Sequence, residues 1–479
     1  MLENLKPESV FKYFELLCSV PHGSGNTKQI SDIIAGFAKD RGLEYYQDEL
    51  NNVVIIKPAS KGYENAAPIM MQGHMDMVCA KEDGLDLDMS VEAIKLAVDG
   101  DWLHAVQTSL GADDCIAVAI MMAVLDDDSL KHPRLECVCT VDEETGMYGA
   151  AALDTSMITA RKLLNLDSEE EGILTAGCSG GGRPNCSIPV QRRPFDGICF
   201  RAEVGGLTGG HSGGEIDKGR ANANKLMARF LHSANSACDM RLVSFVGGNF
   251  DNVITTTSAA EIVTSQPEKL AALAEEYDKI FKNEYKTADP GVFLRLTPMD
   301  DAGMPLGKEC TKNVIDTLFI IPQGIREMSM DIAGLPQTSL NLGILKLAAD
   351  SDECSFSFAV RSSIRSQKHM LLDELRTIVE NAGGSVKVFG EYPEWEYAVK
   401  SDFRDLVAKT AAEILGKDVV ISATHGGLEC GFFCSKIPGL DVVAMGPEMY
   451  DIHSPRERVS ISSVERLYRI VLTVLERSL

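Results

Sequence analysis

Three short apolar runs in the first part of the chain end in acidic or histidine side chains, and this pattern constrains the fold most. Short apolar runs separated by helix-like stretches predict buried parallel strands. Ligands and catalytic groups gather just beyond the carboxyl ends of such strands. Because clustered carboxylates repel one another in a dry setting, the pattern predicts a cation between them. The runs are Pro68–Asp76, Leu135–Glu144 and Lys162–Asp167.

The length of the chain and the order of its helix and strand patterns predict one domain interrupted by another. A chain of 479 residues is too long for a single core and is expected to form two or three domains. Helical and strand patterns alternate up to about residue 183 and again from about residue 393. We therefore predict an α/β domain with a central, largely parallel sheet, formed by residues 1–186 and 393–479. Residues 187–392 are predicted to form an inserted α+β domain, which a proline-rich crossing segment around Arg183 and Pro184 introduces.

The inserted domain shows a weak internal repeat. A strand pattern at Gly197–Val204 is followed by a glycine loop and a helix pattern around Ala223–His232. A second strand pattern at Glu353–Val360 is followed by a helix pattern from Lys368 to Asn381. The two strand-helix pairs suggest a duplicated module.

Charge and cysteine content exclude several classes of partner. The net charge of −24, with no basic run, argues against nucleic acid and anionic membranes. No stretch reaches the ~18 apolar residues that span a bilayer, and the N-terminus lacks a signal-peptide pattern. The 13 scattered cysteines favour a reducing cytoplasm. Cys430 and Cys434 lack a second pair for a structural zinc site, so buried thiols are the simpler interpretation.

The first run ends in His74 and Asp76, whose spacing places both side chains on one face of a strand. His74 could bind a metal while Asp76 holds its other ring nitrogen. Taken alone, a buried histidine with satisfied hydrogen bonds explains the pair equally well.

Acidic pairs supply further candidate ligands. Glu143 and Glu144 point in opposite directions if extended, so that one could bind metal and the other act as general base. A solvated acidic loop is the plain alternative. Asp113 and Asp114 follow Gly-Ala in a predicted loop, where a turn or helix cap would also explain them. A carboxylate there could instead bridge two metals through its two oxygens.

The remaining candidates lie elsewhere. Asp167 closes the third run, His453 lies in a loop before the last helix pattern, and His425 and Glu429 share another polar loop. Each motif is ambiguous by itself. Together they supply the two histidines and three carboxylates that two metals sharing a bridging acid require.

The set of motifs closely resembles the dinuclear zinc metallopeptidases that include carnosinase and carboxypeptidase G. Three motifs are similar to one branch of them, the aminoacyl-histidine dipeptidases or cytosol non-specific dipeptidases. The resemblance spans essentially the whole chain and keeps the order of the motifs. The shared motifs are His74-x-Asp76, Gly-Ala-Asp113-Asp114, Asp-Glu143-Glu144-x-Gly, Asn-x-Asp167 and His453-Ser-Pro. Those of the branch are Gly-Gly-His211-Ser-Gly, Leu-Asn-Leu-Asp167-Ser-Glu-Glu-Glu-Gly and His425-Gly-Gly-Leu-Glu429-Cys-Gly.

The resemblance implies a zinc-peptidase catalytic domain, an inserted lid domain and two divalent metal ions, zinc before cobalt or manganese. One metal would be held by His74, Asp113 and Asp167. The other would be held by Asp113, Glu144 and His453, with Asp113 as the bridge.

The resemblance also implies roles in catalysis and substrate binding. Asp76 would orient His74, Glu143 would be the general base, and His211 of the lid would contact the substrate carbonyl or oxyanion. The substrate would be gripped by Asn252, Arg361, His425 and Glu429. Some positions depart from the family pattern without removing a ligand: Cys115 beside the aspartate pair, Val253 and Thr255 after Asn252, and Arg456 after His453-Ser-Pro.

The implied reaction is hydrolysis of dipeptides, with Xaa-His and β-alanyl-His in a broad set of substrates. A water activated by the two metals would give its proton to Glu143. Arg361 would pair with the free carboxylate of a short peptide. A homodimer formed through the lid domain is a further expectation.

Two other readings compete with this one. Gly210-His-Ser212-Gly-Gly214 matches the G-x-S-x-G motif of serine hydrolases, although that motif requires a strand directly before it and a helix directly after it. The other reading is a metal-binding relative that has lost catalysis.

Overall fold

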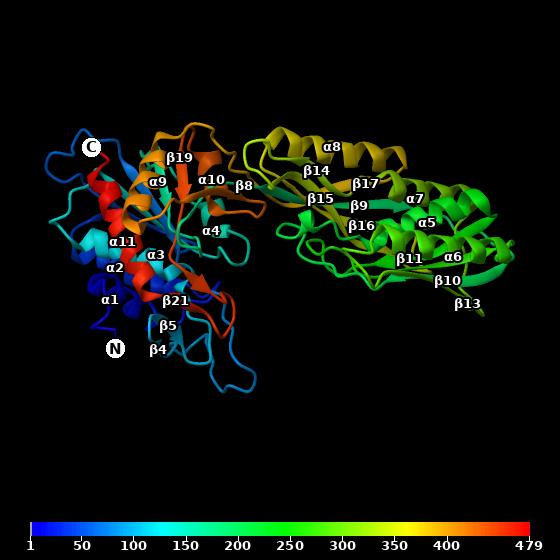
Figure 1. Ribbon diagram of the computed structural model, residues 1–479, viewed down its shortest axis with the longest axis horizontal. Coiled ribbons are helices and arrows are strands. Elements are labelled where there is room, and N and C mark those ends of the chain that lie inside the picture. The colour runs from blue at the N-terminus through cyan, green and yellow to red at the C-terminus, as the bar shows by residue number, and fades with distance from the viewer. Residues whose placement is uncertain (1) are drawn as a thin grey trace. The chain divides into compact units, whose positions relative to one another are not determined.

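The computed structural model describes residues 2–479, which divide into two compact units (Figure 1). The first unit contains the described residues up to Gly177, with 397–423 and 428–479, and the second contains 178–396 and 424–427. Strand β9 (Gly180–Pro189) belongs to the second unit and runs across the domain boundary that was predicted between residues 186 and 187. Arg183 and Pro184, expected in a crossing segment, are strand residues paired with β17 (Ser385–Tyr392). On the other side of β9, the residues paired with β16 skip from Asn185 to Gly182. Pro184 lies in this gap, so its missing N–H costs no hydrogen bond to β16.

The first unit is built on an eight-stranded sheet in the order β1-β2-β6-β3-β7-β19-β8-β18. The three predicted apolar runs form β6, β3 and β7, which are parallel neighbours at its centre, as predicted. Antiparallel pairs lie outside this core. The strands are β1 (Glu44–Gln47), β2 (Val53–Lys57), β3 (Ile69–His74), β6 (Leu135–Thr140), β7 (Lys162–Asn165), β8 (Ile173–Cys178), β18 (Val420–Thr424) and β19 (Asp441–Ala444).

Helices cover this sheet and enclose its main hydrophobic core. Helix α3 (Ala112–Asp126) is buried along almost its whole length because it packs between β3 and α1. Helices α9 and α11 lie side by side (Figure 1). A small sheet of order β20-β21-β5-β4 completes the unit. The other elements are α1 (Glu8–Leu17), α2 (Lys28–Asp40), α4 (Tyr148–Ala152), α9 (Asp402–Leu415), α10 (Glu429–Lys436), α11 (Ile461–Glu476), β4 (Leu96–Asp99), β5 (Trp102–Ala105), β20 (Met449–Tyr450) and β21 (Arg458–Ser460).

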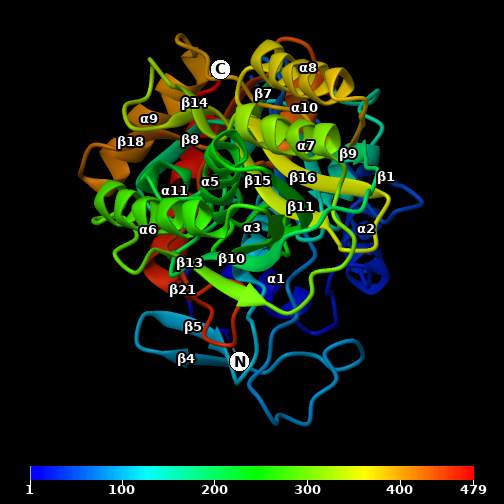
Figure 2. The same ribbon diagram turned by 90° about the vertical axis from the view of Figure 1, so that its right-hand side faces the viewer.

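The second unit is an antiparallel sheet on which four helices pack (Figure 2). Its order is β13-β10-β12-β11-β15-β16-β9-β17, with β14 beside β15. Both predicted strand-helix pairs are present, as β10 with α5 and β16 with α8. The elements are β10 (Ile198–Gly205), η1 (Ile216–Lys218), α5 (Ala223–Ala237), β11 (Met240–Gly247), β12 (Ser258–Thr264), α6 (Pro267–Glu284), β13 (Phe293–Met299), α7 (Lys308–Ile320), β14 (Gly324–Met328), β15 (Pro336–Leu347), β16 (Glu353–Ser362) and α8 (Arg365–Asn381). Among all the described helices of the chain, none is both long and apolar enough to cross a bilayer.

Candidate active site

The carboxyl ends of the central strands bring candidate residues together. His74 is the last residue of β3, while Asp167 follows β7 and Glu143 and Glu144 follow β6. The registers pair His74 with Thr140 of β6 and Gln72 with Asn165 of β7, so the three strands end at nearly the same level. The sheet itself therefore places one histidine and three acids at a common edge.

Asp113 lies between two histidines that are distant in sequence. It sits in the first turn of α3, where it and Asp114 keep non-helical backbone angles. Asp113 Oδ1 lies 3.1 Å from His74 Nε2, and Asp113 Oδ2 lies 3.1 Å from His453 Nε2. Each oxygen of one carboxylate thus faces a different imidazole, which is the arrangement that a bridging ligand needs.

Two more carboxylates complete the surroundings of the histidines. Asp167 Oδ1 is 3.6 Å from His74 Nε2, and Glu144 Oε1 is 2.9 Å from His453 Nε2. Ligand atoms bound to one tetrahedral zinc at about 2.0–2.2 Å lie about 3.3–3.6 Å apart. The Asp167–His74 separation falls in this range, and the other three, at 2.9–3.1 Å, are slightly shorter. The nitrogen and oxygen donors therefore suit a pair of divalent ions once the side chains move slightly apart.

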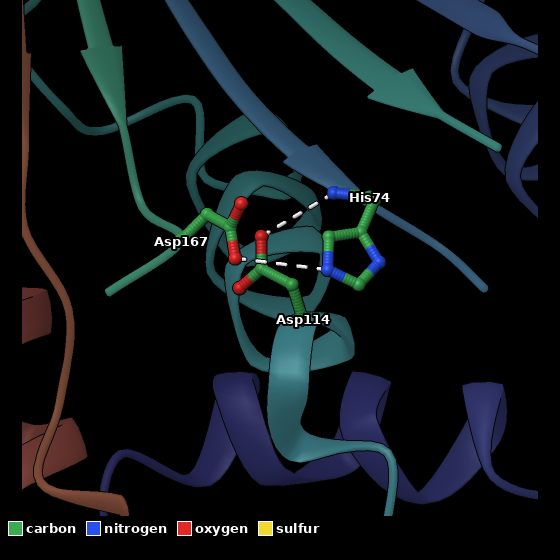
Figure 3. Close-up of side chains that lie close together, drawn as sticks. All are labelled: His74, Asp114 and Asp167. Carbon is green, nitrogen blue, oxygen red and sulfur yellow. Dashed lines mark hydrogen bonds and ion pairs between the residues drawn. The ribbon is translucent and has the colours of Figure 1, made fainter. Parts of the chain in front are cut away.

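Asp114 is a further acid beside His74. Figure 3 shows His74, Asp114 and Asp167 converging, and their donor atoms lie within 4.8 Å of one another. His74, Asp113 and Glu144 form a second such group. Asp114 Oδ2 accepts a bond of 3.3 Å from the backbone N–H of His74, and its buried Oδ1 has no hydrogen-bond partner.

The electrostatics of the cluster show that it lacks positive charge. Hydrogen bonds that the His453 ring donates to the carboxylates of Asp113 and Glu144 raise the pKa of His453 to about 10. Burial and the charge of Asp167 raise the pKa of Asp114 well above that of an ordinary aspartate. Burial also opposes protonation of His74, but Asp167, Asp113 and Asp76 outweigh it and raise its pKa. The carboxylates thus favour positive charge at this cluster, which divalent cations would supply.

The second ring nitrogen of His74 is held by Asp76. His74 Nδ1 donates to the backbone oxygen of Asp76 at 3.0 Å, and the Asp76 carboxylate lies 3.5 Å away. A proton fixed on Nδ1 leaves the lone pair of Nε2 free for a metal.

The Asp76 carboxylate mainly anchors the turn that carries the two glutamates. Its oxygens accept from the backbone N–H groups of Glu143 at 3.2 Å and Glu144 at 3.4 Å. Ser24 Oγ donates to it at 2.8 Å. Glu143 and Glu144 therefore lie in a turn, and the expectation of extended backbone was wrong, because β6 ends at Thr140 and Asp142 takes a positive φ of 55°.

Glu143 and Glu429 are acids whose pKa values are raised chiefly by burial. Burial raises the pKa of Glu143 well above its usual range, and the carboxylates of Asp167, Glu429 and Glu144 add to this rise against the effect of His74. Burial likewise raises the pKa of Glu429 to about 8.

A polar network holds Glu429 in place. Its Oε2 accepts from Gln72 Nε2 and Thr140 Oγ1, each at 2.6 Å, whereas its buried Oε1 has no hydrogen-bond partner. Gln72 Oε1 in turn accepts from Asn165 at 2.7 Å. The network fixes Glu429 against the three strands that also carry the candidate ligands.

The remaining predicted residues form a separate cluster within the second unit. Arg361 is 9% exposed and donates to Tyr392 Oη at 3.0 Å, and its buried Nε has no hydrogen-bond partner among the described residues. His211 Nε2 lies 3.4 Å from Arg361 Nη2, and burial together with the Arg361 charge lowers the pKa of His211. His211 Nδ1 accepts from the backbone N–H of Gly214 at 3.1 Å, and Nε2 faces the Arg361 guanidinium, which can only donate.

Asn252 and His425 belong to the same unit. The backbone oxygen of Asn252 accepts from the N–H of Ser212 at 2.9 Å, which places it beside His211. Both ring nitrogens of His425 already have hydroxyl partners, Ser179 at 2.9 Å and Ser339 at 2.7 Å, and burial lowers its pKa to about 3. A contact of His425 with substrate therefore stays a prediction.

Ser212 lacks the setting of a nucleophile. Its hydroxyl is buried without a partner, at 1% exposure. In the described chain, β10 ends at Gly205, and only the short η1 helix follows, at Ile216–Lys218. A strand directly before the motif and a helix directly after it, as a nucleophile elbow requires, are therefore absent from this segment.

Comparison with known proteins extends this picture. The profile of peptidase family M20/M25/M40 matches residues 70–477. The cytosol non-specific dipeptidase of Escherichia coli is 34% identical over 479 residues, covering 99% of this chain and 98% of that protein. This chain belongs to the M20/M25/M40 peptidase family. The family membership predicted from the motifs is thereby confirmed.

Solved structures agree with the family and the fold. The aminoacylhistidine dipeptidase of Vibrio alginolyticus superposes with a TM-score of 0.94 at 32% identity, covering 99% of this chain and 98% of that one. The aminopeptidase PepT of Bacillus cereus superposes with a TM-score of 0.56 at 17% identity, covering 99% of both chains, and shares the fold.

Three polar residues of these clusters were not predicted from the sequence. Ser24 supports Asp76, Tyr392 supports Arg361, and Glu457 binds the loop before α3. Only Glu457 had a sequence signal, since it is an acid four residues after His453 in the same loop.

Proposed function

We propose that this protein is a metal-dependent dipeptidase that cleaves a broad set of dipeptides, with Xaa-His and β-alanyl-His among them. The observation that carries the proposal is Asp113, whose two oxygens face His74 and His453 at 3.1 Å each. The names of the relatives agree with it, since one is called a non-specific dipeptidase and the other an aminoacylhistidine dipeptidase.

Two divalent ions would be held at this site, and zinc suits the donor set, with cobalt or manganese as alternatives. His74, Asp113 and Asp167 would hold one ion. Asp113, Glu144 and His453 would hold the other. When bound, the ions would supply Lewis acidity toward the scissile carbonyl and toward the attacking water.

Glu143 would move the protons of the reaction. Its raised pKa suits a group that accepts a proton from the attacking water and then donates it to the leaving amine nitrogen. Asp76 would hold the backbone on which Glu143 depends, in addition to orienting His74.

Residues of the second unit would bind the substrate, and we propose that residues 187–392 act as a lid domain. Arg361 is buried and has no carboxylate partner among the described residues, so an anion would compensate its charge. The terminal carboxylate of a dipeptide meets that need, and His211 would contact the carbonyl oxygen or the developing oxyanion. Asn252 would bind the peptide backbone, and Glu429 of the first unit has a free buried acceptor for the substrate.

The cellular setting is also part of the proposal. The E. coli relative is named as cytosolic, and the scattered cysteines of this sequence suit a reducing compartment, which together support a cytoplasmic location. A homodimer formed through the lid domain stays a prediction that sedimentation analysis would test.

A panel of dipeptides assayed before and after chelation, with metal add-back, tests the proposal. We expect hydrolysis to disappear on chelation and to return with zinc, while Ser212→Ala keeps its dependence on metal. Hydrolysis that survives chelation but is lost in Ser212→Ala would establish a serine hydrolase instead. Two bound metals without cleavage of any dipeptide would establish a non-catalytic relative.

A further inference from the structure

Glu457 uses its carboxylate to bind the loop that leads into α3. Its Oε2 accepts from the backbone N–H groups of Leu110 at 2.7 Å and Gly111 at 3.1 Å. Its Oε1 accepts from those of Ala112 at 2.8 Å and Asp113 at 3.4 Å. The side chain is 2% exposed, so these four donors replace the water that the carboxylate loses on burial.

The same carboxylate joins the two loops that carry ligand candidates. Glu457 lies four residues after His453, and its own N–H donates to the backbone oxygen of Ser454 at 3.1 Å. The N–H of Asp113 is among those it binds. The distance between Asp113 and His453 is therefore set partly by one side chain that contacts neither of their metal-facing atoms.

The other ligand candidates do not depend on this link. His74 and Asp167 end or follow β3 and β7, which are hydrogen-bonded neighbours in the sheet. Glu144 lies in the turn that the Asp76 carboxylate anchors. Loosening Glu457 would thus displace Asp113 and His453 relative to ligands that stay fixed.

We propose that Glu457 is a positioning residue of the metal centre and that it controls chiefly the affinity of the ion held by Asp113, Glu144 and His453. This inference rests on the proposed function. The ion held by His74, Asp113 and Asp167 keeps two ligands on the sheet, so it is expected to be the less sensitive of the two. Removing supports of this kind generally weakens metal binding by about 10- to 100-fold.

The test compares Glu457→Gln with Glu136→Gln. Glu136 is a matched control because its buried carboxylate also accepts backbone N–H groups, from Thr159 and Ala160 at 2.9 Å each. It lies near the start of β6, whereas the candidate ligands gather at the opposite ends of the strands. Zinc stoichiometry and affinity are measured by calorimetry on the metal-free full-length protein, and thermal unfolding is followed in chelator.

Wild type is expected to bind two zinc ions, and Glu457→Gln to bind one normally and the other at least tenfold more weakly. Excess zinc should restore hydrolysis in Glu457→Gln. Glu136→Gln should lose thermal stability but keep both affinities. Equal affinities in wild type and Glu457→Gln, or equal weakening of both ions, would overturn the inference.

Two further results keep the test decisive. If Glu457→Gln fails to fold, Glu457→Asp, which keeps the charge on a shorter side chain, must show the same selective loss in weaker form. A wild-type protein that binds fewer than two ions would refute the proposed function itself, a result distinct from two ions that Glu457 does not influence.

Discussion

Replacing Asp76 by Asn tests whether one carboxylate organises the catalytic turn. In the protein, Asp76 accepts from the backbone N–H groups of Glu143 and Glu144 and from Ser24 Oγ. An Asn side chain keeps one acceptor oxygen but presents an NH₂ group to at least one of these donors. A hydrogen bond to a charged group contributes about 1.5–3 kcal/mol. A loss of about 2–3 kcal/mol in the transition state corresponds to a fall in kcat/KM of about 30- to 150-fold.

The assay is steady-state hydrolysis of one dipeptide at saturating zinc, with metal content measured on the same samples. Because Glu143 loses its backbone support, we expect most of the loss in kcat/KM to come from a lower kcat rather than from weaker substrate binding. Ser24→Ala removes a single donor and leaves the acceptor intact, so it should cost no more than about tenfold. Activity within threefold of wild type in Asp76→Asn, with both metals bound, would refute the role given to this carboxylate.

Three other substitutions give separate tests. Glu143→Gln should lower kcat by about 10²–10⁴-fold with two metals retained, and a variant with normal turnover would exclude it as general base. Arg361→Met should lower kcat/KM by about 30-fold or more for free dipeptides but much less for their C-terminal amides, and an equal loss for both would exclude carboxylate binding. His425 has a pKa of about 3 in the folded protein, so the unfolded chain binds the extra proton as pH falls below about 6.5. Stability should therefore fall by about 1.4 kcal/mol per pH unit from this group, or about 2 kcal/mol at pH 5, and urea unfolding of His425→Gln at pH 7 and pH 5 should show that this part of the slope is gone.

The sequence predicted the residues that depend on strand ends. The apolar runs mark β6, β3 and β7, and parallel pairing then requires His74 and Asp167 to emerge at one edge. Asp113 and His453 were candidates from their residue types, but only the family resemblance placed them at one metal, because nothing local indicates that a helix start and a distant loop meet.

The errors arose where backbone leaves a regular strand. Period-two reasoning was extended past Thr140, although Asp142 and Met147 both take positive φ and turn the chain. Such turns depend on tertiary partners, here the Asp76 carboxylate that accepts the N–H groups of Glu143 and Glu144. Likewise, Pro184 indicated a linker, yet it lies within β9. The strand accommodates it because the pairing of β9 with β16 is interrupted between Asn185 and Gly182, where no N–H is needed from Pro184.

Two contacts could not be predicted from the sequence: the anchoring of the Glu143–Glu144 turn by Asp76 and the anchoring of the loop before α3 by Glu457. Asp76 and Glu457 both accept backbone N–H groups of residues that carry candidate ligands or the general base. Backbone donors are present at every position, so no residue pattern marks them as partners. Burial opposes ionisation of both carboxylates. At Asp76 the interactions with His74, Ser24 and the Glu143 N–H outweigh burial and lower the pKa, whereas at Glu457 burial prevails over the backbone N–H groups and raises the pKa. Both supports hold the backbone of residues at the centre, so metal affinity is predicted to fall when either one is replaced without loss of any ligand.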